Sequence, residues 1–289
     1  ERRYILQRIN HLIFRDPVAL MENISRVTTH QNAKLLAAGV PDPERRALTI
    51  IPSREGLPYG RDGEGNYWRT YRFIENARTY DAIENPAQAF QAARAFATFQ
   101  QQVTDLPGGR LHETIPDFHH TPKRLEALIC AIEADEKNRA AQVRKEIDFV
   151  LSRRDLTGVL LKGLEAGELP ERITHNDTKL NNVMLDNVTQ EGICVIDLDT
   201  VMPGLALYDF GDMVRTATSP RPEDELDLSL ITMQMPMFEA LVDGYLTAGH
   251  RFLTPFEREH LPFSGKLITL EIGIRFLTDY LQGDTYFKI

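Results

Sequence analysis

The sequence predicts an α+β protein with two lobes, a small antiparallel-sheet lobe over residues 1–75 and a larger, mainly helical lobe over residues 76–289. Segments rich in β-branched and aromatic residues, at 4–9, 47–53 and 67–75, have the composition of strands. Further along the chain, apolar residues recur at the three- and four-residue spacing of helices. With 289 residues, 42% of them hydrophobic, the chain is long enough to bury the core of both lobes.

The first lobe is predicted to open with the strand over 4–9, followed by a helix. Asp16 has the residue type of a helix cap, and Pro17 fits the first helical position. We expect this helix to run to about Ala37 and to end at Gly39.

The two later strands of this lobe are predicted to be joined by a turn at 61–66, which is rich in Gly, Asp and Asn. Trp68, Tyr71 and Phe73 lie on the second of these strands. Because buried aromatic side chains usually pack in the core, we expect core packing here and no exposed stacking platform.

Pro residues mark the expected helix starts of the second lobe, at Asn85-Pro86, Thr121-Pro122 and Thr254-Pro255. Two more helices are predicted over 139–153 and from Pro262 to about Leu281.

Histidines and cysteines give no sign of a metal site. His112, His119 and His120 lie between two predicted helices without the spacing that metal ligands show, so we expect a solvated loop. Cys130 and Cys194 stand in apolar surroundings and are expected to be reduced core residues.

Charge and hydropathy limit the partners of the protein. A net charge of −9 and a pI near 5.4 argue against nucleic acid, because phosphate backbones require basic surfaces. No secretory leader and no apolar run of membrane-spanning length occurs in the sequence, which favours a cytoplasmic enzyme without a membrane partner.

The candidate catalytic and metal-binding residues lie in one stretch, residues 173–200. Its polar residues form the pattern H-x-D-x-K-x-x-N and end on a further acid that follows an apolar strand: His175, Asp177, Lys179, Asn182 and Asp197. Asn182 follows Asp177 by five positions and Asp197 follows it by twenty, which is the spacing of the catalytic loop in kinase-fold phosphotransferases. The predicted fold class is therefore protein-kinase-like.

Four residues of this pattern suit tasks in phosphoryl transfer. Asp177 is expected to orient the acceptor hydroxyl and accept its proton, and Lys179 to contact the transferring phosphoryl group. Asn182 and Asp197 offer the hard oxygen ligands that Mg²⁺ needs where it bridges the phosphates of ATP. The alternative is a polar loop that merely joins two strands, and the ordered set of residues argues against it.

A second motif, Asp209-Phe210-Gly211, spells the metal-binding triplet of protein kinases. We do not assign the metal to it, because it follows Pro203-Gly204 and does not end a strand, whereas Asp197 does. Asp209 is expected to stabilise the catalytic loop or to cap a helix that starts near Phe210.

The rest of the predicted site is less sharply marked. Backbone groups at Phe73 and Ile74, where the first lobe ends, are expected to bind adenine. Glu22 is either the partner of a phosphate-binding side chain on the first strand or an ordinary solvated charge. Arg275 lies in an apolar helical run, so it either forms a structural ion pair with Asp209 or Asp212 or binds substrate.

Several strings together resemble the N-acetylhexosamine 1-kinases of the aminoglycoside phosphotransferase-like superfamily: 3–10 (RYILQRIN), 174–185 (THNDTKLNNVML), 197–204 (DLDTVMPG), 208–212 (YDFGD), 261–265 (LPFSG) and 273–286 (GIRFLTDYLQGDTY). This resemblance, which covers nearly all of the chain, implies ATP- and Mg²⁺-dependent phosphorylation of N-acetylglucosamine or N-acetylgalactosamine at C1. It implies that Asp177 faces the C1 hydroxyl, that Asn182 and Asp197 bind metal, and that Arg275 and Tyr286 lie near the sugar.

Two departures from the family accompany the resemblance. The first strands of the family would precede Glu1, so we expect a truncated first lobe and a longer protein at both ends. Gln7 occupies the position at which kinases carry a phosphate-binding Lys. Since Gln is neutral, either Arg8 is recruited or the site relies on the metal ions and Lys179.

Two other functions remain open on the sequence. The same fold can phosphorylate an amino alcohol, an aminoglycoside or another sugar, and a cationic acceptor would require an acidic pocket. The chain can also be a non-catalytic sugar- or nucleotide-binding protein, although the complete set of Asp177, Asn182 and Asp197 argues for an enzyme.

Overall fold

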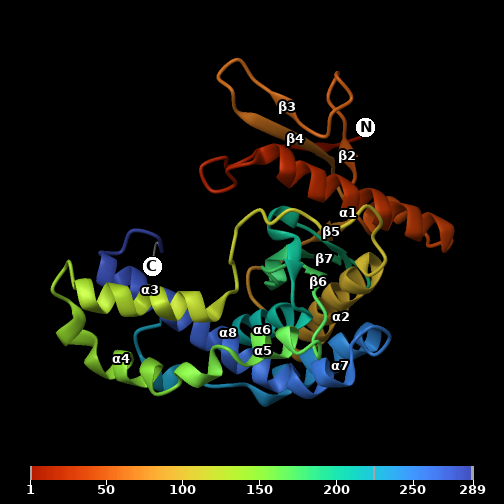
Figure 1. The fold of residues 1–289 in the computed structure, drawn as a ribbon. Coiled ribbons are helices and arrows are strands. Elements are labelled where there is room, and N and C mark those ends of the chain that lie inside the picture. The colour runs from red at the N-terminus through yellow and green to blue at the C-terminus, as the bar shows by residue number, and fades with distance from the viewer. Residues whose placement is uncertain (1, 224, 288–289) are drawn as a thin grey trace.

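The computed structural model describes residues 2–223 and 225–287 and has an α+β fold with small antiparallel sheets and long helices (Figure 1). Its first part contains an antiparallel sheet of four strands: β1 (Tyr4–Arg8), β4 (Tyr67–Arg72), β2 (Ile50–Ile51) and β3 (Gly60–Arg61). Strand β4 pairs with each of the other three. Helix α1 (Pro17–Ala37) has the predicted bounds, and the Asp16 side chain accepts from the N–H groups of Val18 and Ala19.

The second part is mainly helical. Its helices are α2 (Pro86–Val103), α3 (Thr121–Ala134), α4 (Arg144–Leu151), α5 (Val159–Glu165), α6 (Ala206–Ala217), α7 (Met235–Gly249) and α8 (Pro255–Gln282). Two small antiparallel sheets lie among them, β5-β7-β8 and β6-β9, formed by β5 (Ala77–Arg78), β6 (Arg172–Thr174), β7 (Val183–Asp186), β8 (Gly192–Val195) and β9 (Met202–Gly204). None of the helices in the described ranges is both long and apolar enough to cross a membrane.

One hydrophobic cluster joins the two parts of the chain. Leu20 and Ile24 of α1 are fully buried together with Ala93 and Phe96 of α2. Asn23 of α1 also donates from Nδ2 to the carbonyl oxygen of Val201 at 3.1 Å. Helix α1 is therefore anchored beside the residues that follow β8, where the predicted metal ligand Asp197 lies.

Several expectations from the sequence are wrong in detail. Pro262 does not begin a helix; it lies inside α8, which starts at Pro255 with a capping box formed by Thr254 and Glu257. The loss of one backbone donor at Pro262 is tolerated because α8 packs along α6 and α3. The strand expected over 47–53 is reduced to Ile50–Ile51, since only these two residues pair with β4.

Two predictions of core packing are also corrected. Tyr71 is buried, but Trp68 is only half-buried and donates from Nε1 to Asp62, and the ring of Phe73 is covered by the guanidinium of Arg3 at 3.9 Å. Cys194 is buried as expected, whereas Cys130 is exposed because it lies on the outer face of α3.

Candidate active site

The catalytic loop between β6 and β7 brings three of the predicted residues together. Asp177 Oδ1 lies 3.2 Å from Lys179 Nζ, and its Oδ2 accepts from Asn182 Nδ2 at 3.1 Å. Asn182 Nδ2 also donates to the carbonyl oxygen of Asp177 at 2.8 Å. Asp177 and Lys179 remain about one-third and two-fifths exposed, at 32% and 43% of their side-chain area. Both side chains are therefore open to a bound molecule.

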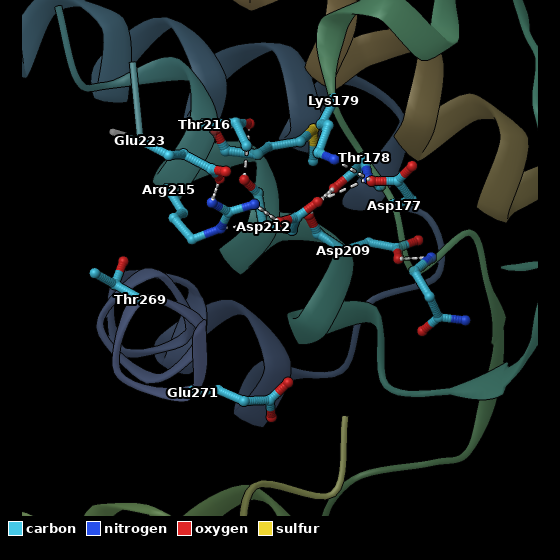
Figure 2. Close-up of polar contacts among 12 residues, drawn as sticks. Asp177, Thr178, Lys179, Asp209, Asp212, Arg215, Thr216, Glu223, Thr269 and Glu271 are labelled. Carbon is cyan, nitrogen blue, oxygen red and sulfur yellow. Dashed lines mark hydrogen bonds and ion pairs between the residues drawn. The ribbon is translucent and has the colours of Figure 1, made fainter. Parts of the chain in front are cut away.

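Helix α6 holds this loop through two carboxylates, which Figure 2 shows beside it and which are both buried. Asp209 accepts from the backbone N–H groups of His175 at 2.9 Å and Asn176 at 2.7 Å, and from Gln100 Nε2 at 2.6 Å. Asp212 accepts from the N–H of Thr178 at 2.9 Å. Asp209 therefore stabilises the catalytic loop, as predicted, although its helix begins at Ala206 and not near Phe210.

His175 connects the catalytic loop to the strand that leads to Asp197. Its Nε2 donates to the carbonyl oxygen of Ile196 at 2.8 Å, and its Nδ1 accepts the N–H of Asp177 at 3.3 Å. The ring is fully buried and packs edge-on against Phe96 and Phe99. These two hydrogen bonds identify the neutral tautomer with its proton on Nε2, so His175 is a positioning group here.

Asp197 has the properties of a cation ligand. Its backbone adopts the left-handed conformation with φ of 56°, and its exposed carboxylate makes no hydrogen bond or ion pair with any described residue. Crowding by surrounding protein atoms and the like charge of Asp199 raise the pKa of this carboxyl. Since the residue before it, Ile196, donates its N–H to the carbonyl oxygen of Asn182 at 2.9 Å, Asn182 and Asp197 belong to adjacent chain segments.

This donor set fits a Mg²⁺ ion that shares its coordination with phosphate. Among residues 2–223 and 225–287, no three His, Cys, Asp or Glu side chains converge as a complete protein metal site. Asn182 donates from its amide nitrogen to Asp177, so the amide oxygen of Asn182 is free to bind a metal ion. The carboxylate of Asp197 has no partner among the described residues and is free as well. Mg²⁺ commonly takes one or two protein oxygens and completes its octahedron with phosphate and water.

The first sheet supplies a buried cation that the sequence analysis missed. Arg69 of β4 lies directly opposite Gln7 of β1, donates from Nε to Gln7 Oε1 at 3.2 Å, and forms an ion pair with Asp199. Burial acts to lower the pKa of Arg69, but Tyr71, Asp199 and Asp197 raise it overall. Only the pairing of β1 with β4 reveals this residue, because no sequence motif contains it.

The segment after β4 retains backbone groups that can bind a ligand. Ile74 is buried, and its N–H and C=O make no hydrogen bond with any described residue. The N–H of neighbouring Phe73, by contrast, donates to the carbonyl oxygen of Arg3 at 3.0 Å. Glu22 does not reach the first strand, since its carboxylate lies 3.0 Å from His112 Nε2.

Arg275 lies on α8, which packs along α3. It makes no ion pair with Asp209 or Asp212, so the expectation of a structural ion pair with either residue is wrong. Asp212 pairs with Arg215 instead, with 2.9 Å between Asp212 Oδ1 and Arg215 Nη2. The Arg275 guanidinium lies 5.6 to 5.8 Å from the ring centres of Phe118, Tyr286 and Phe287. These residues and Arg124 line a cavity of about 350 Å³.

The expectation of a solvated histidine loop is wrong for His119. Its buried ring lies between Glu271 Oε1, 2.8 Å from Nδ1, and the carbonyl oxygen of Asn176, 3.3 Å from Nε2. Thr121 donates to the other oxygen of Glu271 at 2.5 Å. The segment before α3 thus connects α8 to the residue that precedes Asp177. His120 caps α3 by accepting the N–H of Lys123.

Comparison with known proteins identifies the fold. The profile of a family described as "Phosphotransferase enzyme family" matches residues 1–258. An amicoumacin kinase solved with AMP-PNP, Ca²⁺ and Ami superimposes with a TM-score of 0.59, at 14% identity over 98% of this chain and 82% of that one. A spectinomycin phosphotransferase in an AMP-bound complex superimposes with a TM-score of 0.54, at 12% identity over 100% of this chain and 84% of that one.

An ethanolamine kinase from Plasmodium vivax gives a TM-score of 0.51, at 15% identity over 99% of this chain and 72% of that one. At such low identities the superpositions show a shared fold alone. The kinase-like α+β fold class that the sequence predicts is confirmed.

Proposed function

The chain belongs to the phosphotransferase enzyme family, and we propose that it transfers the γ-phosphoryl group of ATP to the C1 hydroxyl of an N-acetylhexosamine. The fold and the loop geometry support phosphoryl transfer to a small hydroxyl compound. The choice of acceptor rests on the cavity beside Arg275 and on the resemblance of the loop sequences to N-acetylhexosamine 1-kinases.

The choice of acceptor depends mainly on the charge of this cavity. Two of its lining residues are arginines, Arg124 and Arg275, and the carboxylate among them, Asp279, accepts from the backbone N–H groups of Thr285, Tyr286 and Phe287 at 2.8 to 2.9 Å. Burial and the positive charge of Arg275 lower the pKa of Arg124. A cavity with excess positive charge repels a cationic acceptor and suits hydroxyl and acetamido oxygens.

The aromatic lining supports the same choice. The rings of Phe118, Tyr286 and Phe287 offer apolar faces on which a sugar ring can pack, while the arginine donors bind its oxygens. Phe118 directly precedes His119, which contacts the carbonyl oxygen of Asn176. The acceptor cavity and the base Asp177 are therefore connected by one short segment.

Within this proposal each loop residue has one task. Asp177 orients the acceptor hydroxyl and takes its proton, which a hemiacetal hydroxyl releases more readily than an ordinary alcohol. Lys179 offers its ammonium group to the transferring phosphoryl group; partial burial acts to lower its pKa, but Asp177 and Asp212 raise it, so it stays charged. Asn182 and Asp197 would hold a Mg²⁺ ion, which would supply charge neutralisation at the phosphates.

An amino alcohol or aminoglycoside is the competing acceptor, since proteins of this fold include an ethanolamine kinase and a spectinomycin phosphotransferase. A cationic acceptor requires free carboxylates near Asp177. The acidic residues around the neighbouring cavity of about 200 Å³ are paired: Glu113 and Glu171 bind Arg110, and Asp117 binds Lys123. This pairing weakens the case for a cation.

An ADP-release assay with the full chain tests the proposal across N-acetylglucosamine, N-acetylgalactosamine, glucose, galactose, choline and kanamycin. We expect turnover with the two acetamido sugars and a product that carries phosphate at C1 by ³¹P NMR. Turnover with choline or kanamycin alone would assign the competing function. Binding of sugar or nucleotide without turnover would indicate a non-catalytic relative.

A further inference from the structure

The phosphate end of the nucleotide site requires a positive charge that Gln7 does not supply. In kinases this charge is a strand lysine, which a glutamate of the following helix holds in place. Here the strand residue is the neutral Gln7, and the candidate helix glutamate, Glu22, is bound to His112. Neither member of the usual ion pair is available from these positions.

Arg69 lies on the face of the sheet that would carry this lysine. Gln7 and Arg69 are direct partners in the antiparallel pair of β1 and β4. Side chains of directly opposite residues project to the same face, so Arg69 and Gln7 share one face. Arg8 is opposite Trp68 and projects to the other face, since successive side chains of a strand alternate.

The contacts of Arg69 hold it in place without using all of its donors. Its side chain is only 6% exposed, Nε donates to Gln7 at 3.2 Å, and Nη1 is ion-paired with Asp199. The other terminal nitrogen, Nη2, has no hydrogen-bond partner among the described residues. Some of its surface remains exposed, because it is absent from the set of fully buried nitrogen and oxygen atoms without a partner. One donor group of the guanidinium is therefore unpaired among the described residues and not fully enclosed by protein.

Asp199 places this donor beside the metal ligand. It lies two residues after Asp197, on the turn that follows β8, and its carboxylate joins that turn to the first sheet. An ion pair that a buried arginine makes with a carboxylate also fixes the direction of the guanidinium plane.

We propose that Arg69, held by Asp199 and Gln7, binds the phosphates of the nucleotide and replaces the strand lysine of other kinases. The inference rests on the proposed use of ATP. The Arg69–Asp199 pair then corresponds to the lysine–glutamate pair, with its members moved to the neighbouring strand and to the turn after Asp197.

Nucleotide binding to the full chain tests this assignment through the phosphate groups. We expect Arg69→Gln to weaken the binding of Mg·ATP and Mg·ADP by about tenfold to a hundredfold, as loss of a hydrogen bond to a charged group does. Adenosine, which has no phosphate, should bind as tightly as before. Arg8→Gln, on the opposite face of the same sheet, tests the alternative that Arg8 is recruited, and should bind all three ligands like the wild type. Selective loss of Mg·ATP and Mg·ADP binding in Arg8→Gln but not in Arg69→Gln would assign the phosphates to Arg8 instead.

Arg69→Gln leaves Asp199 without its partner and can destabilise the protein for that reason alone. The double variant Arg69→Gln/Asp199→Asn removes both charges and should show the same selective loss of ATP and ADP binding. Equal weakening of all three ligands, or no weakening, would overturn the inference. Failure of the wild type to bind Mg·ATP at all would overturn the proposed function as well.

Discussion

The Oδ1 atom of Asp209 accepts the backbone N–H of Asn176 at 2.7 Å, and so connects α6 to the residue that precedes Asp177. Asn176 has a φ of 65°, a left-handed conformation that asparagine adopts more readily than most residues. Its Nδ2 donates to the carbonyl oxygen of Thr200 at 2.9 Å. The backbone in front of Asp177 is thus held by a helix on one side and by the turn after Asp197 on the other.

Asp209→Asn should lower the stability of the protein while leaving its metal site intact. The carboxylate accepts three N–H groups, and an amide in its place must turn its own NH₂ toward at least one of them. Each buried donor left unpaired costs about 1–3 kcal/mol. Urea unfolding should show this loss, whereas the Mg·ATP affinity of the folded variant should change little. Weaker Mg·ATP binding without loss of stability would instead assign the metal to Asp209.

Gly211, the last residue of the D-F-G triplet, is predicted to serve packing. A Cβ atom there would lie 2.5 Å from the carbonyl oxygen of Ser264 and 2.7 Å from Ile268 Cγ1, so α6 and α8 approach each other only with glycine. Gly211→Ala should cost about 1–3 kcal/mol of unfolding free energy.

Gly273→Ala on α8 is the control for that measurement. No atom lies within 4 Å of a Cβ built at Gly273, so alanine should stabilise the helix by about 0.5–1 kcal/mol. If both alanine variants changed the unfolding free energy in the same direction, the packing role of Gly211 would be refuted.

The contribution of His119 to stability should depend on pH. Burial acts to lower the pKa of His119, but Glu271, Asp212 and the hydrogen bond to Asn176 raise it overall. A group with a raised pKa in the folded state contributes fully below its unfolded value, about 6.5, and this contribution is lost as pH rises through the folded value. The contribution of Glu271 to stability has the opposite pH dependence. Its pKa is lowered overall in the folded state, so this contribution is lost only in acid.

Unfolding in urea of the wild type and His119→Gln, measured from about pH 6 into the alkaline range, checks the direction of this pH dependence. The difference in unfolding free energy should be largest at the acid end and should shrink as pH rises. A difference that grew with pH would show that His119 is neutral in the folded protein.

Arg275→Ala should weaken binding of the acceptor sugar and leave binding of the nucleotide unchanged. Arg275 lines the acceptor cavity and faces three aromatic rings. Loss of a charged hydrogen-bond donor should raise the KM for the acceptor about tenfold to a hundredfold, with the KM for Mg·ATP unchanged. Arg144→Ala, at an arginine of α4 that is 71% exposed, is the control and should match the wild type. An effect on Mg·ATP alone would remove Arg275 from the acceptor site.

The part of the site that lies within one short stretch was predictable from the sequence. Asp177, Lys179 and Asn182 are held within eight positions of His175, and the loop geometry brings them into contact. The bracing role of Asp209 was also predictable, but one reason given for it was wrong: Pro203 and Gly204 do not form a turn, since they belong to β9 and pair with β6. The assignment of the metal to Asp197 stays a prediction.

Contacts between distant segments were not predictable from one sequence. Arg69 meets Asp199 across 130 positions, and only the register of β1 with β4 shows that it shares a face with Gln7. His119 meets Glu271 across 152 positions, so it was expected to be a solvated loop residue. The helix that contains Pro262 continues because tertiary packing outweighs the local preference of proline.

Asp177 is assigned to the acceptor hydroxyl, and Asn182 and Asp197 are assigned to the metal ion. These two tasks are separated by Mg·ATP dissociation constants and kcat, measured together for the wild type, Asp177→Asn and Asp197→Asn. Asp177→Asn should lower kcat by about a hundredfold or more and leave Mg·ATP binding nearly unchanged, whereas Asp197→Asn should weaken Mg·ATP binding about tenfold or more. Loss of Mg·ATP binding in Asp177→Asn, with normal binding in Asp197→Asn, would contradict the assignment.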